Sequence, residues 1–271
     1  MDGTLNRPGN ALIKSRKRLT ATCSWPDANI HIRLGAGEVH AWCAKLNASE
    51  KNLLYFQRSL DPDEISRASR FHFDRDRKRY IARHGLLREI LGHYLSMRPA
   101  EVQFAYNSHG KPFLSDDLQS QDLNFNISSS RDLTLFVFVR GRQIGVDIEK
   151  IRQNIEFEEL VERFFSENEG KAFQLVNPQS KLQTFFCIWA RKEAYIKAQG
   201  QGLSVPLSRF DVSVDLHNKA EIFVANREAM EKDRWVLHDL DPAAGYAAAL
   251  AIQGKDWHLQ RWRAVPEIFI A

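Results

Sequence analysis

The sequence predicts an α+β fold of two similar halves in a pseudo-twofold arrangement, with the active site in the cleft between them. Asp61-Pro-Asp-Glu64 and Ser166-Glu-Asn-Glu169 both show a helix start, in which a capping residue is followed three positions later by glutamate. The two glutamates are 105 positions apart, and each short helix precedes a longer helical segment. Alternating or continuous apolar segments, typical of strands, flank both pairs. A weak internal repeat follows, and the seam between two halves is a common place for ligands.

The composition is that of an ordinary globular protein. Of the 271 residues, 44% are hydrophobic and 27% charged, which is enough for a sizeable core. No apolar run approaches the roughly 18 residues that a membrane span needs, and the first residues lack the apolar centre of a secretory signal. We therefore expect a cytoplasmic protein without membrane contact. Its three widely spaced cysteines favour reduced thiols over a disulfide frame or a zinc site.

Three segments are expected along the chain. Residues 1–28 are basic and lack apolar periodicity, so we expect a flexible N-terminal segment. Residues 29–141 form the first α+β half and residues 142–271 the second, joined near Arg140 to Gln143. The elements expected in the first half are strands at 30–34, 39–43, 125–128 and 133–139, helices from Asp61 to about Phe71 and from about Asp74 to Ser96, and a turn at 107–112.

The second half is expected to begin with a strand at 144–149. A helix with a capping box follows at Ser166, and a longer helix contains Trp189 and ends at Gly200, where a C-terminal cap is typical. The later strands are expected at 210–214, 220–224, 235–238 and 246–252, with a possible last strand at 257–263.

Two pairs of charged residues, one of two acids and one of an acid and a lysine, point to a metal site. Asp147 and Glu149 are two apart in a strand, so their side chains leave the same face. Glu193 and Lys197 are four apart, so they share one face of the Trp189 helix. If strand and helix lie side by side, three carboxylates converge with a lysine one turn away. Such a cluster suits Mg²⁺, with Mn²⁺ as an alternative, and the lysine suits a phosphate.

Each pair also has an ordinary interpretation. A glutamate and a lysine four apart are often a solvated surface pair, and Asp-x-Glu on a strand is often exposed decoration. The apolar residues Ile144, Val146 and Ile148 favour a central strand, and the aromatic run before Trp189 favours a buried helix start. These two features favour the metal site.

Basic residues gather between Arg67 and Arg83. The seven are Arg67, Arg70, Arg75, Arg77, Lys78, Arg79 and Arg83. A solvated face is the default interpretation of such a run, and an anionic partner is the alternative. No nucleic-acid motif accompanies the run, so nucleic acid is not an expected partner.

Three motifs together resemble a known family. They are Gly145-Val-Asp-Ile-Glu149, Arg163-Phe-Phe-Ser-Glu-Asn-Glu169 and Trp189-x-x-Lys-Glu-Ala-x-x-Lys-Ala-x-Gly-x-Gly-Leu203. They are similar to the signature of the 4′-phosphopantetheinyl transferases, in the long, pseudo-dimeric Sfp-type branch, and the match extends from about Arg67 to Leu250. The resemblance implies an enzyme that moves the phosphopantetheine arm of coenzyme A to a serine of an apo acyl or peptidyl carrier protein, releasing adenosine 3′,5′-bisphosphate. It also implies a monomer.

The resemblance assigns roles in the second half. Asp147, Glu149 and Glu193 would bind the metal, and Glu193 would also act as the base. Lys197 would neutralise charge on the diphosphate, and Lys192 would touch the same phosphates or the arm.

In the first half the resemblance implies the nucleotide end of the coenzyme site. His109, Gly110, Lys111 and Pro112 match a turn that meets the adenine and the 3′-phosphate, with Lys111 on phosphate. Phe125-Asn-Ile-Ser128 matches a Phe-Asn-x-Ser-His-Ser motif, so Asn126, Ser128 and Ser129 belong to the expected site, and Arg67 and Arg79 match looser basic positions. Ser129 stands where the family has histidine, and it lacks the positive charge of a protonated histidine.

Two other functions share some of these features. A magnesium-dependent phosphotransferase or nuclease could share the carboxylates alone, and a non-catalytic module could bind acidic carrier proteins through the basic run. The separate nucleotide-end motifs favour the transferase.

Overall fold

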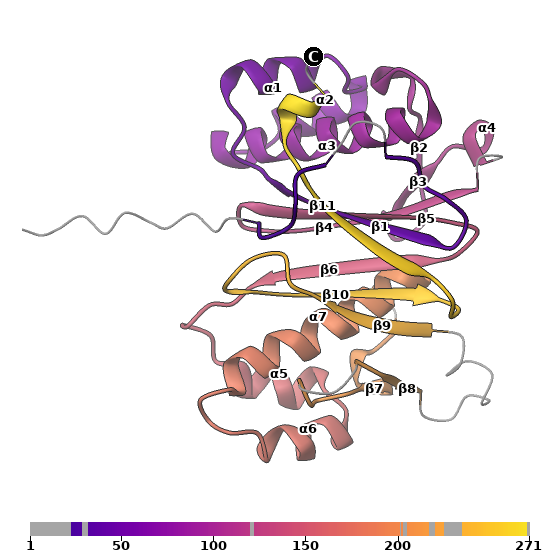
Figure 1. The fold of residues 1–271 in the computed structure, drawn as a ribbon. Coiled ribbons are helices and arrows are strands. Elements are labelled where there is room, and N and C mark those ends of the chain that lie inside the picture. The colour runs from indigo at the N-terminus through magenta and orange to yellow at the C-terminus, as the bar shows by residue number, and fades with distance from the viewer. Residues whose placement is uncertain are drawn as a thin grey trace, which may run out of the picture.

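The computed structural model describes residues 23–28, 32–119, 122–200, 202, 205–216, 220–224 and 235–269. It has four layers, in which two sheets lie face to face and each is covered by helices on its outer side (Figure 1). One sheet has the strand order β11 (His258–Ala264), β1 (Glu38–Lys45), β5 (Leu133–Arg140) and β4 (Leu123–Ser130), and the other has the order β6 (Ile144–Lys150), β10 (Tyr246–Gln253) and β9 (Trp235–Leu240). The predicted α+β fold of two halves is confirmed.

The first half follows the sequence prediction closely. Its elements are β1 (Glu38–Lys45), α1 (Glu50–Gln57), α2 (Pro62–Ser69), α3 (Asp74–Leu95), the 3₁₀ turn η1 (Pro99–Glu101), β2 (Phe104–Tyr106), β3 (Pro112–Leu114), α4 (Asp116–Gln119), β4 (Leu123–Ser130) and β5 (Leu133–Arg140). Several details differ from the prediction. Residues 32–34 are not a strand, and helices α1 and α4 and the short strands β2 and β3 were not expected.

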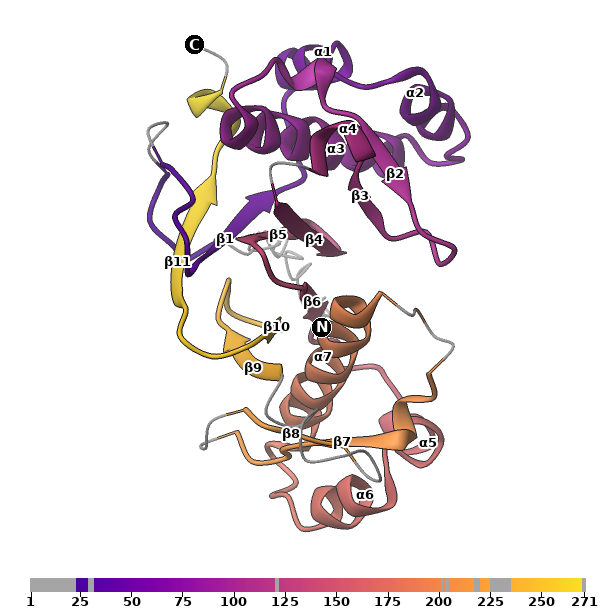
Figure 2. The same cartoon turned by 90° about the vertical axis from the view of Figure 1, so that its right-hand side faces the viewer.

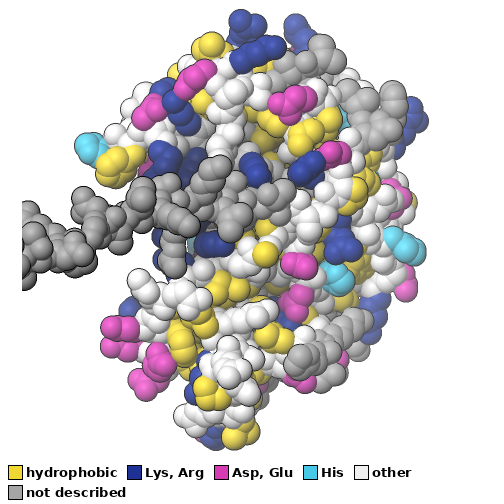
Figure 3. Space-filling model, turned by 60° about the vertical axis from the view of Figure 1, so that its left-hand side comes forward, with side chains coloured by type: hydrophobic (Ala, Val, Ile, Leu, Met, Phe, Trp, Pro, Cys, Tyr) yellow, Lys and Arg dark blue, Asp and Glu magenta, His cyan; other side chains and the backbone are white. Residues whose placement is uncertain are grey.

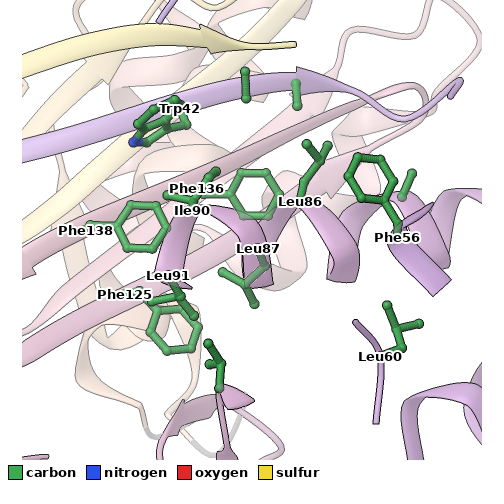
Figure 4. Packing of buried hydrophobic residues seen from close by; sticks show 14 of the residues in the cluster. Trp42, Phe56, Leu60, Leu86, Leu87, Ile90, Leu91, Phe125, Phe136 and Phe138 are labelled. Atoms are coloured by element: carbon green, nitrogen blue, oxygen red, sulfur yellow. The ribbon is translucent and has the colours of Figure 1, made fainter. Parts of the chain in front are cut away.

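A capping box fixes the start of α2, and apolar packing holds α3 on the sheet. The Asp61 side chain accepts the Glu64 N–H at 2.8 Å, and the Glu64 carboxylate accepts the Asp61 N–H at 3.0 Å, so the predicted capping box is confirmed. One face of α3 then packs on the sheet, where Leu86 and Ile90 meet Phe136 (Figure 4). Burial of these apolar side chains fixes α3 across the strands that lead to the site.

The second half differs from the prediction in one helix, α5 (Phe157–Phe164), and in the position of strand β11. Its elements are β6 (Ile144–Lys150), α5 (Phe157–Phe164), α6 (Glu167–Gln174), α7 (Lys181–Gln199), the 3₁₀ turn η3 (Leu207–Arg209), β7 (Phe210–Val212), β8 (Ile222–Val224), β9 (Trp235–Leu240), β10 (Tyr246–Gln253), β11 (His258–Ala264) and the 3₁₀ turn η4 (Pro266–Ile268). Helix α5 was not expected. Strand β11 does not join the second half, because it pairs in parallel with β1 from Glu38↔His258 to Ala44↔Ala264.

The chain therefore returns to the first half at its C-terminal end. Residues 142–271 do not form one half, since β11 is the edge strand of the sheet that β1, β5 and β4 complete. Part of the expected flexible segment is also ordered. Asp27 forms an ion pair with Arg263 on β11 at 2.6 Å, and the Ser24 N–H donates to the Pro242 carbonyl at 3.0 Å. Residues 1–22 lie outside the described residues.

The inner layer between the two sheets is apolar. It is lined by alternate residues of β1, β5, β6 and β10, such as Val137 and Val146, and includes the buried free cysteines Cys23 and Cys43. Among the described residues, no helix is long and apolar enough to cross a membrane.

Candidate active site

The site lies where the open edges of the two sheets meet. Strand β6 was expected to be central, but it is the edge strand of its sheet. Its outward N–H groups are satisfied by side chains of β4 instead of by a neighbouring strand. Val146 donates to Asn126 Oδ1 at 2.9 Å, and Lys150 donates to Ser130 Oγ at 3.0 Å. The apolar flanks that suggested a central strand reflect burial between the layers.

Ser128 occupies the middle of this seam. It accepts the Ile148 N–H at 3.4 Å, and its own hydroxyl donates to Asp147 Oδ1 at 2.9 Å. Asn126, Ser128 and Ser130 are two apart, so they share one face of β4. The role of Ser130 was missed, although this spacing in the sequence signals it.

Close packing of α7 on β6 brings the carboxylates together. A Cβ at Gly145 would lie 2.2 Å from the Ala194 carbonyl oxygen and 2.3 Å from the Ala198 nitrogen, so only glycine permits this approach. Asp147 and Glu149 lie on the same face of β6 as Gly145, so their side chains point toward α7. Helix α7 and strand β6 therefore lie side by side, as the predicted convergence of the carboxylates requires.

Asp147 is the most buried member of the cluster, with 3% of its surface exposed. Its Oδ1 accepts from Lys197 Nζ at 2.5 Å and from Ser128. Its Oδ2 is buried and has no hydrogen-bond partner among the described residues. A buried, unpaired carboxylate oxygen is costly, so it marks a place suited to a cation or another donor.

Burial and the Asp147 carboxylate both raise the pKa values of Glu149 and Glu193. Burial raises the pKa of Glu149, and the Asp147 carboxylate raises it further, while Ser130 donates to Glu149 Oε2 at 2.9 Å. Burial also raises the pKa of Glu193; Lys197 opposes this shift, and the other two carboxylates add to it. Repulsion among neighbouring carboxylates is what a bound cation relieves.

No ready-made metal site is present in the part of the chain that the structure describes. There, no group of three His, Cys, Asp or Glu side chains is arranged to hold an ion. Lys197 lies against Asp147 instead. The donor set suits magnesium in chemistry, since all three side chains offer carboxylate oxygens.

The predicted contact of Lys192 with the phosphates or the arm is wrong. Its side chain is fully buried, and its ammonium donates to both oxygens of Glu169, at 2.6 and 2.7 Å, and to the Phe210 carbonyl at 2.6 Å. An ammonium has three donors, and all are used. Lys192 therefore cannot reach the phosphates or the arm. It holds α6 to α7 inside the core.

Lys111 also differs from expectation. Gly110 has the positive φ of 79° that suits a tight turn, and the expected turn is present between β2 and β3. The Lys111 ammonium, however, points away from solvent to the carbonyls of Lys197 at 2.7 Å and Ile144 at 3.2 Å. Burial lowers the pKa of Lys111 to about 8. The structure does not support its predicted phosphate contact.

Two other residues of the turn, His109 and Pro112, have different surroundings. His109 packs beside Gly202, where a Cβ would lie 3.0 Å from the His109 side chain. A cavity of about 370 Å³ borders Pro112, Phe125 and Gly200. A larger cavity of about 1120 Å³ lies at the end of α3 and touches none of the predicted site residues.

The remaining predicted residues lie on the first half. The Arg67 guanidinium covers the Tyr106 ring at 4.8 Å. Arg79 is engaged with Asp132 and Asp76. Ser129 faces away from the seam and donates to Thr134 Oγ1 at 2.9 Å.

Comparison with known proteins identifies the family. A family model described as the 4′-phosphopantetheinyl transferase superfamily matches residues 143–251, and one described as 4′-phosphopantetheinyl transferase, N-terminal, matches residues 44–139. The 4′-phosphopantetheinyl transferase HetI of Nostoc sp. is 35% identical over 239 residues, which cover 88% of this chain and 98% of HetI. The 4′-phosphopantetheinyl transferase Sfp of Bacillus subtilis is 28% identical over 202 residues, covering 74% and 86%.

Solved structures give weaker likenesses. Holo-[acyl-carrier-protein] synthase of Thermotoga maritima aligns with a TM-score of 0.33 and 20% identity over 42% of this chain and 63% of that chain. The ACPS–CoA complex of Chronobacterium ammoniagenes aligns with a TM-score of 0.32 and 22% identity over 42% and 98%. Nothing about function follows from scores this low.

The family models and the HetI match define a group-transfer enzyme: the chain belongs to the 4′-phosphopantetheinyl transferase superfamily. Within it, the chain falls in the Sfp-type branch, in agreement with the resemblance of its motifs.

Proposed function

We propose that this enzyme transfers phosphopantetheine from coenzyme A to a serine of an apo carrier protein. The reaction takes place where the edge strands β4 and β6 meet and α7 packs on β6. The serine oxygen forms a bond to the phosphorus on the arm side of the diphosphate. The bridging P–O bond breaks, its electron pair leaves with adenosine 3′,5′-bisphosphate, and the serine proton goes to a base. The observation that supports the proposal is the Lys197–Asp147 ion pair at 2.5 Å, in a setting where burial and the Asp147 carboxylate raise the pKa values of Glu149 and Glu193.

Magnesium is part of the proposal, with manganese as the alternative. Asp147, Glu149 and Glu193 would hold the ion, which would neutralise the diphosphate oxygens when bound. The unpartnered Asp147 Oδ2 and the raised pKa values of both glutamates support a cation there. Lys197 supplies a second positive charge from the same side.

Glu193 is proposed as the base that accepts the serine proton, directly or through water. Burial raises the pKa of its carboxyl in the metal-free protein, and a bound cation would oppose that shift, so the base role rests on the position of Glu193. Its place one helical turn before Lys197 puts the base and the phosphate-binding cation on the same face of α7.

The nucleotide end needs positive charge that Ser129 cannot supply. Arg67 lies beside Tyr106, and Arg83 is a second candidate. The Arg83 Nε is buried without a hydrogen-bond partner, and its guanidinium lies 5.6 Å from the Tyr80 ring. Burial lowers the pKa of Arg83, and its Nη2 lies 3.3 Å from Nε2 of the neighbouring His84, without a carboxylate ion pair among the described residues. We propose that these two arginines receive the 3′-phosphate.

The carrier protein is proposed to dock through charge. Carrier proteins are acidic around the modified serine, so a basic surface attracts them. On the face shown in Figure 3, lysine and arginine side chains are more frequent in the upper part, on the side of the first half, than in the lower part. The adjacent aromatic residues Phe164 and Phe165 are a second candidate docking surface, of which only Phe164 is partly exposed, because Phe165 is buried. Modification of the carrier should weaken at high salt while coenzyme affinity changes little.

One experiment separates the candidate functions. The protein is incubated with coenzyme A, magnesium and an apo-carrier protein, and the carrier is weighed by mass spectrometry. Asp147→Asn and Glu193→Gln should abolish the mass gain, and Lys171→Met, at an exposed surface pair, should not. A mass gain that does not depend on divalent metal would contradict the metal site. No gain on any apo-carrier would refute the transferase proposal and leave the binding-module alternative.

A further inference from the structure

We infer that Asn107 and Lys111, on the turn between β2 and β3, are positioning residues that fix the C-terminal end of α7 against β6. This inference rests on the proposed function, because α7 carries Glu193 and Lys197. It replaces the expected phosphate contact of Lys111 with a role inside the protein.

Lys111 acts on the end of the helix. The last carbonyl groups of a helix have no partner within it, and a cation there is favourable because the helix dipole places partial negative charge at that end. The Lys111 ammonium lies 2.7 Å from the Lys197 carbonyl oxygen and 3.4 Å from that of Ala198. It also lies 3.2 Å from the carbonyl of Ile144, the first residue of β6. One side chain thus joins helix and strand.

Asn107 holds the last residue of the same cap. Its Nδ2 donates to the Gly200 carbonyl at 2.8 Å, and Gly200 adopts the left-handed conformation that ends α7. Its Oδ1 accepts the N–H groups of His109 at 3.0 Å and Lys111 at 2.9 Å. Asn107 therefore shapes the turn with one atom and binds the helix end with the other.

These contacts cross from one half to the other. Figure 2 shows the β2–β3 hairpin reaching from the first half towards the end of α7. The helix passes very close to β6 at Gly145, and Lys197 contacts Asp147 one turn before the cap. If the cap were lost, the end of α7 could move relative to β6, and Lys197 would lose its fixed distance to Asp147. Small displacements of reacting groups cost about ten- to a hundredfold in rate.

The first test needs no substrate. Hydrogen exchange is measured on the free full-length protein for the wild type, Lys111→Met and Asn107→Asp. The Asp variant keeps the oxygen that shapes the turn but loses the donor to Gly200. We expect amides at 198–200 to exchange about tenfold faster in both variants, while amides in α3 keep their rates. Lys111→Arg, which keeps a cation, should restore part of the protection, and Lys171→Met is the matched control at an exposed lysine. Unchanged exchange at 198–200 in both variants would overturn the inference.

The second test separates positioning from phosphate binding. For Lys111→Met we expect kcat to fall about tenfold or more, with the Kd values for coenzyme A and for 3′-dephospho-coenzyme A changed by the same factor. A role on the 3′-phosphate predicts the opposite, namely weaker binding of coenzyme A alone with kcat unchanged, and that result would refute the inference. If the wild type transfers nothing, the proposed function fails, and the exchange experiment still decides whether the cap exists.

Discussion

Replacing Lys192 by methionine tests whether this lysine belongs to the core or to the coenzyme site. Methionine keeps most of the side-chain length and removes the ammonium that lies between the two oxygens of Glu169. The Glu169 carboxylate then remains 2% exposed, with only the N–H groups of Ser166 at 2.8 Å and Val212 at 2.7 Å as donors. A buried charge without its partner should destabilise the folded state strongly.

The expected size follows from the burial of both groups. Removing one member of a buried ion pair costs about 3–5 kcal/mol. For a chain of this length, 1 kcal/mol corresponds to about 2–4 °C, so Tm should fall by roughly 10 °C. The double variant Lys192→Met with Glu169→Gln should recover part of this loss, because it removes the uncompensated charge as well.

The assays are urea and thermal unfolding followed by tryptophan fluorescence, together with titration of coenzyme A. The matched control is Lys171→Met, since Lys171 pairs with Glu167 while both side chains are at least 70% exposed. An exposed pair contributes about 0–1 kcal/mol, so this variant should unfold almost like the wild type. A Lys192→Met protein of normal stability that binds coenzyme A weakly would refute the assignment of this lysine to the core.

Three further predictions concern the site. Asp147→Asn should abolish transfer and lower the pKa values of Glu149 and Glu193, because one source of repulsion is gone; NMR titration of the glutamate side chains should show the shift, and unchanged pKa values would contradict the coupling. Both glutamates bind protons more tightly when folded, so the metal-free protein should lose stability as pH rises from about 4.3, the ordinary glutamate pKa, through the raised folded values. Magnesium should reverse this loss. Glu149→Gln should flatten the pH dependence of the free energy of unfolding, and a slope equal to that of the wild type would contradict the predicted contribution of Glu149. Ser129→His should bind coenzyme A more tightly, as measured by calorimetry, and an unchanged Kd would show that the serine costs nothing.

The features predicted correctly from sequence are those with local causes. The capping boxes at Asp61 and Ser166 depend on residues three positions apart, so both can be predicted from the sequence alone. The same holds for the face shared by Glu193 and Lys197. The edge position of β6 could not be predicted in this way. It depends on β4 side chains whose polar spacing becomes meaningful only when the two strands are adjacent.

The two lysines of α7 show the limit most clearly. Lys192 and Lys197 lie in one motif, but they are five apart and so point in different directions around the helix. Lys192 lies three before Tyr195, a buried core residue, and that spacing was an available signal for the core. Whether an ammonium in the core finds a carboxylate, as Lys192 finds Glu169, depends on tertiary packing. The partners of Lys111 are likewise 33 to 87 positions away in the chain.

The parallel pairing of β11 with β1 determines how this protein can be cut. A fragment ending at residue 141 would leave β1 with an uncovered edge, and its partner strand would remain attached to the other fragment. An exposed strand edge invites association with other chains. Separate expression of residues 1–141 and 142–271 should therefore give fragments that associate with other chains, whereas a fragment of residues 1–141 supplied with a peptide of residues 254–271 has the strands needed to complete its sheet.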